Sequence, residues 1–157
     1  MFRDRRSLLL VPALAILSLG IGCGGGKEQV SASELDQKAD QICSTEQTKF
    51  KQIQAQAPAN ASEAADQTKQ LIAAAESASS AIDDLEPPDA LGGALDIYLG
   101  ARNDAIDQMK KGQDAAENQD SRTYGTAQAA VSKSAPQRKK LAESLGFKVC
   151  SARIGAV

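Results

Sequence analysis

The chain has no histidine and no tryptophan, and it has only three phenylalanines and two tyrosines among 157 residues. Histidine is the commonest general base and the commonest metal ligand, so its absence removes the usual basis for either kind of site. No serine lies in the glycine-flanked turn that exposes a hydrolase nucleophile. The three glycines at 24–26 are followed by Lys27 and Glu28, not by the lysine and hydroxyl residue of a phosphate-binding loop. The sequence therefore predicts no catalytic residues and no cofactor.

A metal site is not expected either. Two cysteines without histidine fall short of the four ligands of a closed zinc site. One acidic cluster supplies the carboxylates that calcium prefers: Asp83, Asp84, Glu86 and Asp89. Its spacing matches no calcium-binding loop, and a solvated helix corner accounts for it without a metal.

The first 22 residues have the pattern of a secretory signal peptide. Three arginines, at positions 3, 5 and 6, lead into an apolar run over residues 8–19, and small residues follow. The stretch from residue 8 to residue 22 is shorter than the about 20 residues that span a bilayer, and Pro12 interrupts it. We therefore predict a cleaved leader over 1–22 and an extracytoplasmic protein, not a permanent membrane helix.

Cys23, directly after the small residues, resembles the acylated cysteine of the lipobox in bacterial lipoproteins. Gly22 has the small side chain that the peptidase of that family needs, while Gly20 stands where the family prefers leucine. The resemblance implies that Cys23 carries lipid and holds the protein on the outer face of the cell membrane. The alternative is an ordinary signal peptide cut nearby, with Cys23 left as a free thiol. Arg5 and Arg6 also resemble a twin-arginine export signal, so the export route stays open.

The composition of the remaining chain favours helices. Removal of the leader leaves 15 basic and 19 acidic residues, a net charge of −4, which argues against a nucleic-acid binder. Alanine and glutamine are abundant and β-branched residues are sparse, which is typical of helices and not of strands.

Cys43 and Cys150 remain once Cys23 is assigned to the lipid. An exported protein meets oxidising conditions, so we expect these two cysteines to form a disulfide. A bond that closes a loop of about 100 residues contributes about 4 kcal/mol in the chain-entropy model. That is a large share of the about 5–15 kcal/mol of a typical domain.

Four segments carry apolar residues at the three- and four-residue steps of an amphipathic helix. The first begins with a capping box, Ser31 and Glu34, and ends before Pro58. The second begins in the same manner at Asn60 and ends at the two prolines that follow Glu86.

The third helix follows Pro88, and its apolar pattern fades into an expected turn between residues 111 and 120. The fourth begins at Asp120 or the next residue and stops at Gly146. Pro136 lies inside the fourth helix and is expected to kink it.

Four helices joined by short turns predict an all-α, up-down-up-down antiparallel four-helix bundle. The expected divisions are a lipoprotein signal peptide at 1–22, a flexible tether at 23–30, the bundle at 31–152 and a frayed C-terminus at 153–157. In this topology the fourth helix ends beside the beginning of the first, so Cys150 approaches Cys43. Because Cys43 lies well inside the first helix, either the residues after Gly146 run back along the bundle or the first helix overhangs.

Arg102 falls on the apolar side of the third helix, where we expect the aliphatic part of its side chain to lie on the core edge and its guanidinium in water.

Basic residues near the end of the fourth helix are expected to contact anionic lipid beside the anchor: Arg138, Lys139, Lys140, Lys148 and Arg153. The acidic turn over 83–89 lies at the same end and opposes that contact.

Over most of its length the chain resembles small, single-disulfide lipoproteins of high-GC Gram-positive bacteria that have no established activity. The resemblance rests on Cys23 and on the stretches 39–43, 85–88 and 145–150. It implies a fold and a location but no mechanism. We expect a membrane-anchored module without catalytic activity that binds a partner, such as another envelope protein, or serves as an envelope accessory. The alternative is a carrier of a small apolar ligand in the bundle interior.

Overall fold

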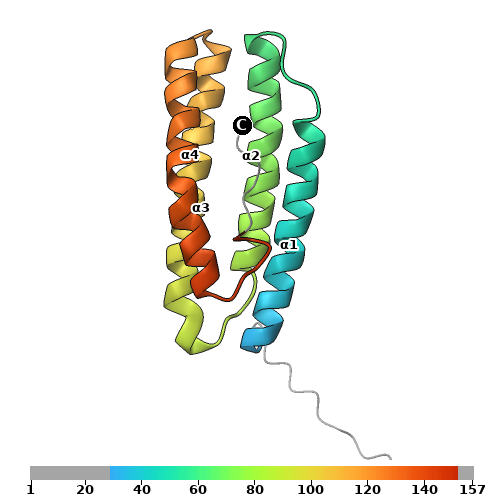
Figure 1. Ribbon diagram of the computed structural model, residues 1–157, viewed down its shortest axis with the longest axis vertical. Helices are drawn as coiled ribbons and strands as arrows, with labels where there is room; N and C mark the ends of the chain where they lie inside the picture. The colour runs from blue at the N-terminus through green and yellow to red at the C-terminus, as the bar shows by residue number, and fades with distance from the viewer. Residues whose placement is uncertain (1–28, 152–157) are drawn as a thin grey trace, which may run out of the picture.

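The computed structural model describes residues 29–151, and this part of the chain forms four helices and no strand. They are α1 (Ala32–Ile53), α2 (Ala61–Asp83), α3 (Asp89–Glu117) and α4 (Ser121–Ser144). Successive helices run in opposite directions and lie side by side (Figure 1). The predicted all-α four-helix bundle is confirmed. The stretch expected to be a signal peptide, Cys23, most of the expected tether and the expected frayed C-terminus at 153–157 lie outside the described residues.

Side-chain caps set the beginnings of three helices. The backbone N–H of Glu34 donates to the Ser31 hydroxyl at 3.3 Å, and the Ser31 N–H donates to the Glu34 carboxylate at 2.9 Å. The predicted capping box is therefore present, and the backbone hydrogen bond from Ser31 lowers the pKa of the Glu34 carboxyl. Asn60 and Asp120 cap α2 and α4 in the same way, each accepting from the backbone N–H three residues on, at 2.9 and 3.0 Å.

The third helix is longer than the sequence pattern predicted. Instead of fading at residue 111, α3 continues to Glu117, and the turn to α4 occupies only residues 118–120. Gly112 lies inside this last part, where a Cβ would sit 3.4 Å from the Cβ of Ala127 on α4. The glycine therefore allows α3 and α4 to approach closely, and Ala115 and Ala116, one turn further along α3, are buried as well. This packing outweighs the low helix propensity of the segment.

The stop of α4 at Gly146 is as predicted. Gly146 has φ +88°, and the N–H of Phe147 donates to the carbonyl of Ala142 at 3.0 Å. This is a Schellman motif, in which glycine takes the left-handed position and the next residue makes an apolar contact. Phe147 is accordingly 1% exposed and packs edge-on against Tyr98, with ring centroids 5.7 Å apart.

Beyond Phe147 the chain runs back along α1, which is the first of the two arrangements that the sequence allowed (Figure 1). The Asp40 carboxylate on α1 accepts the backbone N–H groups of Val149 at 2.8 Å and Lys148 at 3.1 Å. A disulfide then joins Cys150 to Cys43, with the two Cα atoms 5.2 Å apart and 107 positions apart in sequence. The last helix and the first are thereby linked covalently.

The residues just before α1 are hydrogen-bonded to the connection between α2 and α3. The N–H of Val30 donates to the carbonyl of Glu86 at 2.9 Å, and the Gln29 amide donates to Pro87 and Asp89, both at 3.0 Å. The last two residues of the expected flexible tether, Gln29 and Val30, are therefore docked on the α2–α3 connection. The chain enters the bundle at the end where α4 also finishes.

The core has two clusters, one in each half of the bundle. The first contains Tyr98 and Phe147 near the disulfide, and the second contains Phe50, Leu71 and Ile106. Extensive packing joins α1 to α2, α2 to α3 and α3 to α4, whereas α1 and α4 are connected mainly through the C-terminal segment. No helix among residues 29–151 is apolar over a length sufficient to cross a bilayer.

Candidate functional site

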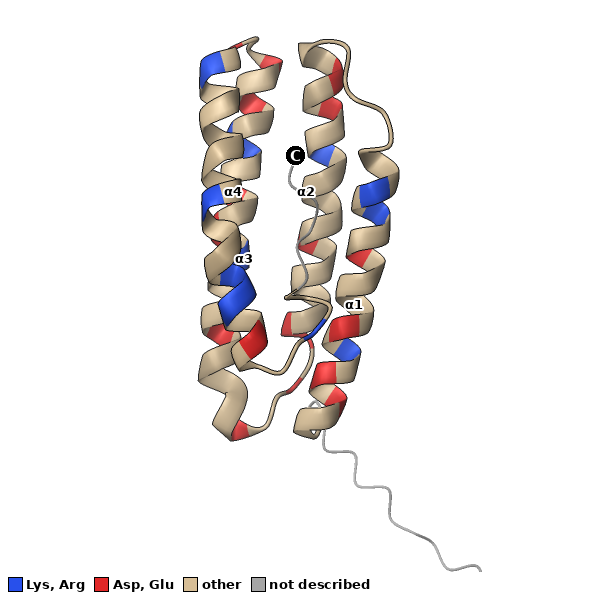
Figure 2. Ribbon diagram, viewed as in Figure 1, with Lys and Arg blue, Asp and Glu red and all other residues tan. Residues whose placement is uncertain are grey.

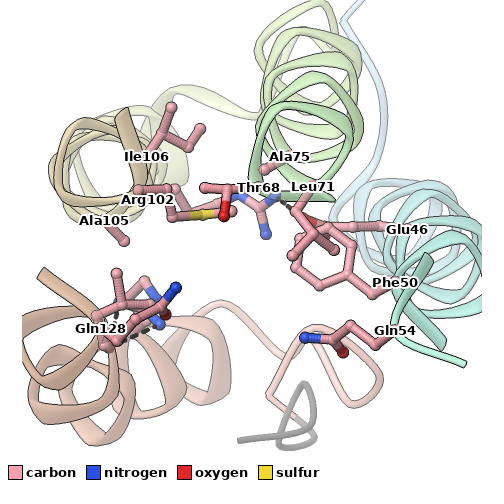
Figure 3. Close-up of a pocket in the computed structure, with 13 residues that line it drawn as sticks. Glu46, Phe50, Gln54, Thr68, Leu71, Ala75, Arg102, Ala105, Ile106 and Gln128 are labelled. Carbon is pink, nitrogen blue, oxygen red and sulfur yellow. Dashed lines mark hydrogen bonds and ion pairs between the residues drawn. The ribbon is translucent and has the colours of Figure 1, made fainter. Parts of the chain in front are cut away.

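A cavity of about 90 Å³ lies in the bundle interior, and all four helices contribute to its wall (Figure 3). Most of that wall is apolar and includes Phe50, Leu71 and Ile106. Gln54 of α1 and Gln128 of α4 stand on the side where those two helices face each other (Figure 3). The cavity is thus a mixed pocket with polar groups at defined places.

The cavity exists because α4 brings little volume to the interior. Only Ala127 and Ala142 of α4 are fully buried, and Val131 is the largest aliphatic side chain that α4 adds to the cavity wall. Small side chains on one of four helices leave space that the other three do not fill.

A buried ion pair crosses the bundle at this cavity. The Arg102 guanidinium of α3 donates to Oε1 of Glu46 on α1 at 2.8 Å, and the two side chains are only 7% and 2% exposed. Arg102 also donates to the hydroxyls of Ser79 on α2 at 3.0 Å and Tyr98 at 3.3 Å. The pair therefore ties α1, α2 and α3 together, and the expectation that the head of Arg102 lies in water is wrong.

Charge compensates for burial within this network. Burial alone would lower the pKa of Arg102, but the negative charge of Glu46 and the interactions with Tyr98 together outweigh it, and the pKa lies above the ordinary arginine value. Burial raises the pKa of the Tyr98 hydroxyl, although the charge of the neighbouring Arg102 opposes the rise. At neutral pH Arg102 is therefore a cation and Tyr98 an uncharged hydroxyl.

The second carboxylate oxygen of Glu46 has no hydrogen-bond partner among residues 29–151. Oε1 is paired with Arg102, whereas Oε2 is buried and accepts no hydrogen bond from these residues. An unpaired buried acceptor of a charged group costs about 1–3 kcal/mol or more, so native proteins rarely leave one. Glu46 is also one of the residues that line the cavity.

Arg138 of α4 brings a second cation to the same cavity. Its guanidinium donates to the Ser134 hydroxyl and, at 3.4–3.5 Å, to the carbonyl of Val131, both on its own helix. It forms no ion pair with a carboxylate of residues 29–151. Burial and the positive charge of Arg102 lower the pKa of Arg138. The site thus holds one anion and two cations, of which one cation lacks a counter-charge.

The residues expected to touch the membrane do not share one surface. Arg138 is half-buried in the cavity wall, while Lys139 is exposed and paired with Glu143 one turn further along α4. Lys140 and Lys148 are exposed at the same end of the bundle, and Arg153 lies outside the described residues. Figure 2 shows acidic residues at this end as well, at the beginning of α1 and around the α2–α3 connection. Arg138 is therefore placed differently from the expectation, and contact of the others with lipid stays a prediction.

Glu46 is the site residue that sequence reasoning missed. It lies in the apolar stripe of α1 between Cys43 and Phe50, a position that buries a carboxylate, and Arg102 occupies the corresponding kind of position on α3. A carboxylate and a guanidinium that each lie in an apolar stripe of a predicted bundle could have indicated a buried ion pair. Within the described part of the chain, the acids at 83–89 do not form a group that could hold a metal.

Comparisons with known proteins add no functional information. No protein-family model matches the chain, and no curated protein or solved structure matches it significantly.

Proposed function

We propose that this protein is an extracytoplasmic lipoprotein, anchored on the outer face of the cell membrane through Cys23, whose bundle is a non-catalytic binding module. The anchor is supported by the leader pattern over residues 1–22 and by the small residues before Cys23. The binding role is supported by the interior cavity, in which all four helices place residues and a buried carboxylate oxygen has no partner.

The docked Gln29 and Val30 define how the bundle would stand on the membrane. Gln29 lies six positions after Cys23, and an extended chain of that length spans about 20 Å at most. The end of the bundle that carries the α2–α3 connection would therefore face the lipid, together with Lys148 and the end of α4. The cavity is lined by residues from the middle of the helices, such as Leu71 and Ile106, and not by residues at that end.

A small molecule is a better occupant of this module than a large protein partner. Among the described residues, the exposed large hydrophobic side chain is Ile97, which is 62% exposed. One such residue is not the contiguous apolar patch that typically marks a protein interface. The cavity, in contrast, combines apolar walls with a few placed polar groups, as ligand sites generally do.

The second candidate is the carrier of a wholly apolar ligand. The walls formed by Phe50, Leu71 and Ile106 favour it. Glu46 and Arg138 disfavour it, because an apolar occupant would leave both of their free polar groups unpaired.

The test of the anchor is metabolic labelling with a clickable fatty acid, followed by separation of membrane and soluble fractions. The native protein is expected in the membrane fraction with label, and Cys23→Ser is expected without label. The double variant Cys43→Ser, Cys150→Ser is the matched control, because it removes two thiols and keeps the anchor. Label that persists in Cys23→Ser, or a native protein that is exported without label, contradicts the proposal.

A further inference from the structure

The cavity at Glu46 and Arg138 has the polar pattern of a ligand site and not of a packing defect. A defect between apolar helices is lined by apolar groups and stays empty. Here one wall presents a buried carboxylate oxygen to which no residue of 29–151 donates, and another presents a guanidinium that forms no ion pair with a carboxylate of those residues. The two groups come from different helices, α1 and α4, which make few direct contacts with each other.

The net charge of the site selects the sign of the ligand. Glu46 and Arg102 neutralise each other at 2.8 Å, so the remaining charge is the single positive charge of Arg138. The Arg138 donors now reach only a hydroxyl and a carbonyl on α4, the latter at 3.4–3.5 Å, beyond the 2.7–3.2 Å of a good hydrogen bond. A carboxylate would accept two parallel hydrogen bonds from a guanidinium and supply the missing negative charge.

The free oxygen of Glu46 requires a second feature of the ligand, a hydrogen-bond donor. An ionised carboxylate only accepts hydrogen bonds, so its partner must be an O–H or N–H donor. A ligand that carried a carboxylate alone would leave Oε2 unpaired and would place a second anion close to Glu46. A hydroxyl or ammonium group next to the carboxylate removes both problems.

The volume of the cavity limits the size of the ligand. A cavity of about 150 Å³ is known to admit benzene, so about 90 Å³ in a partly open cavity limits the ligand to a short acid of about six or seven heavy atoms, part of which lies outside the enclosed space. The apolar wall at Phe50, Leu71 and Ile106 would contact a short aliphatic chain.

We propose that this cavity binds a small aliphatic carboxylate that bears a hydrogen-bond donor next to the carboxyl group, a short 2-hydroxy or 2-amino acid. The carboxylate pairs with Arg138, the hydroxyl or ammonium donates to Oε2 of Glu46, and the alkyl chain lies on Phe50 and Leu71. This inference rests on the proposed binding role and specifies its ligand class. It does not depend on whether Cys23 is acylated.

The test is a calorimetric titration of the full-length protein in detergent micelles at neutral pH. The probes form a matched set: 2-hydroxybutanoate, 2-aminobutanoate, butanoate without the donor, 1-propylamine without the carboxylate, and uncharged 1-butanol. The two donor-bearing acids are expected to bind at least tenfold more tightly than butanoate, and propylamine is expected not to bind.

Three variants and one control locate the site. Arg138→Met is expected to weaken binding of the acids at least tenfold, and Val131→Phe is expected to abolish it by filling the cavity. Glu46→Gln is expected to remove the preference for 2-hydroxybutanoate over butanoate, a selectivity that a merely structural role would not change. Lys140→Met removes an exposed charge two residues along the same helix and is expected to leave all affinities unchanged.

Several results would overturn the inference. One is the absence of saturable binding by folded native protein, which would mean that only water occupies the cavity and would leave the anchoring proposal untouched. Another is equal weakening by Arg138→Met and Lys140→Met, because it would indicate attraction to surface charge. Tighter binding of 1-butanol than of the acids would favour the carrier of apolar ligands instead.

Discussion

The ion pair between Glu46 and Arg102 gives the sharpest prediction about stability. Both side chains are almost fully buried, and their atoms are 2.8 Å apart. Removing one partner of a buried pair leaves an uncompensated charge in a medium of low polarity, at a cost of about 3–5 kcal/mol. For a domain whose total stability is about 5–15 kcal/mol, either single variant should therefore be severely destabilised.

Arg102→Met and Glu46→Leu replace each charge with an apolar side chain of similar size. Arg102→Met should be the more damaging, because it leaves Glu46 with neither oxygen paired. In Glu46→Leu, Arg102 keeps its hydrogen bonds to Ser79 and Tyr98. The double variant removes both charges, and we expect its stability to return to within about 1 kcal/mol of the native protein or to exceed it.

The assay is urea denaturation followed by the helical circular dichroism signal, with the disulfide kept oxidised in all four proteins. The interaction free energy of the double-mutant cycle then isolates the pair from the loss of packing. Exposed ion pairs give about 0–1 kcal/mol in such cycles. Single variants that each lose about 1 kcal/mol or less, with additive effects in the double variant, would refute the buried pair.

Three further predictions follow from local structure. The double variant Cys43→Ser, Cys150→Ser opens a loop of 107 positions and should lower the free energy of unfolding by about 4–5 kcal/mol relative to the oxidised protein, as measured by denaturation. A loss below about 1 kcal/mol would show that the disulfide does not stabilise the bundle. Gly146→Ala should destabilise by about 1–2 kcal/mol or more, because φ is +88° and the new Cβ would lie 2.8 Å from the Asp36 carboxylate, whereas Gly125→Ala meets open space and should be neutral or stabilising; equal effects of the two would contradict the Schellman stop. The hydrogen bonds from Thr123 lower the pKa of Asp120, so the contribution of this carboxylate to stability is present above the unfolded pKa of about 3.9 and is lost as pH falls through the lower folded value. Asp120→Asn keeps a capping side chain and should reduce the loss of stability with falling pH. An unchanged pH dependence would show that the carboxylate does not act as the cap.

Local chemistry explains most of what the sequence predicted correctly. Ser31 with Glu34, Asn60 and Gly146 act within one turn of the chain, so their signals can be read without knowing the fold. The pairing of Cys43 with Cys150 was predicted from the cysteine count and an oxidising compartment, and the predicted topology, in which the last helix returns to the first, agreed with it.

The errors concern contacts between distant segments. The length of α3 was underestimated because the value of Gly112 depends on Ala127, its neighbour on another helix. The burial of Arg102 depends on Glu46, which is 56 positions away. Neither partner is visible in the periodicity of a single helix.

Neither local capping chemistry nor the periodicity of a single helix predicts the cavity. It results from small side chains along α4 meeting ordinary ones on the other three helices. The sequence shows the abundance of alanine but not how the small side chains of α4 face the other helices. Only the arrangement of all four helices shows that a space of about 90 Å³ remains and which charged groups line it.

The intact mass of the native protein, purified from its own membranes, tests the central claim most directly. The account predicts a chain that begins at Cys23, carries the added mass of a diacylglycerol, and is lighter by two hydrogens because Cys43 and Cys150 are joined. An exported chain with an unmodified Cys23, or one with three free thiols, would contradict the account.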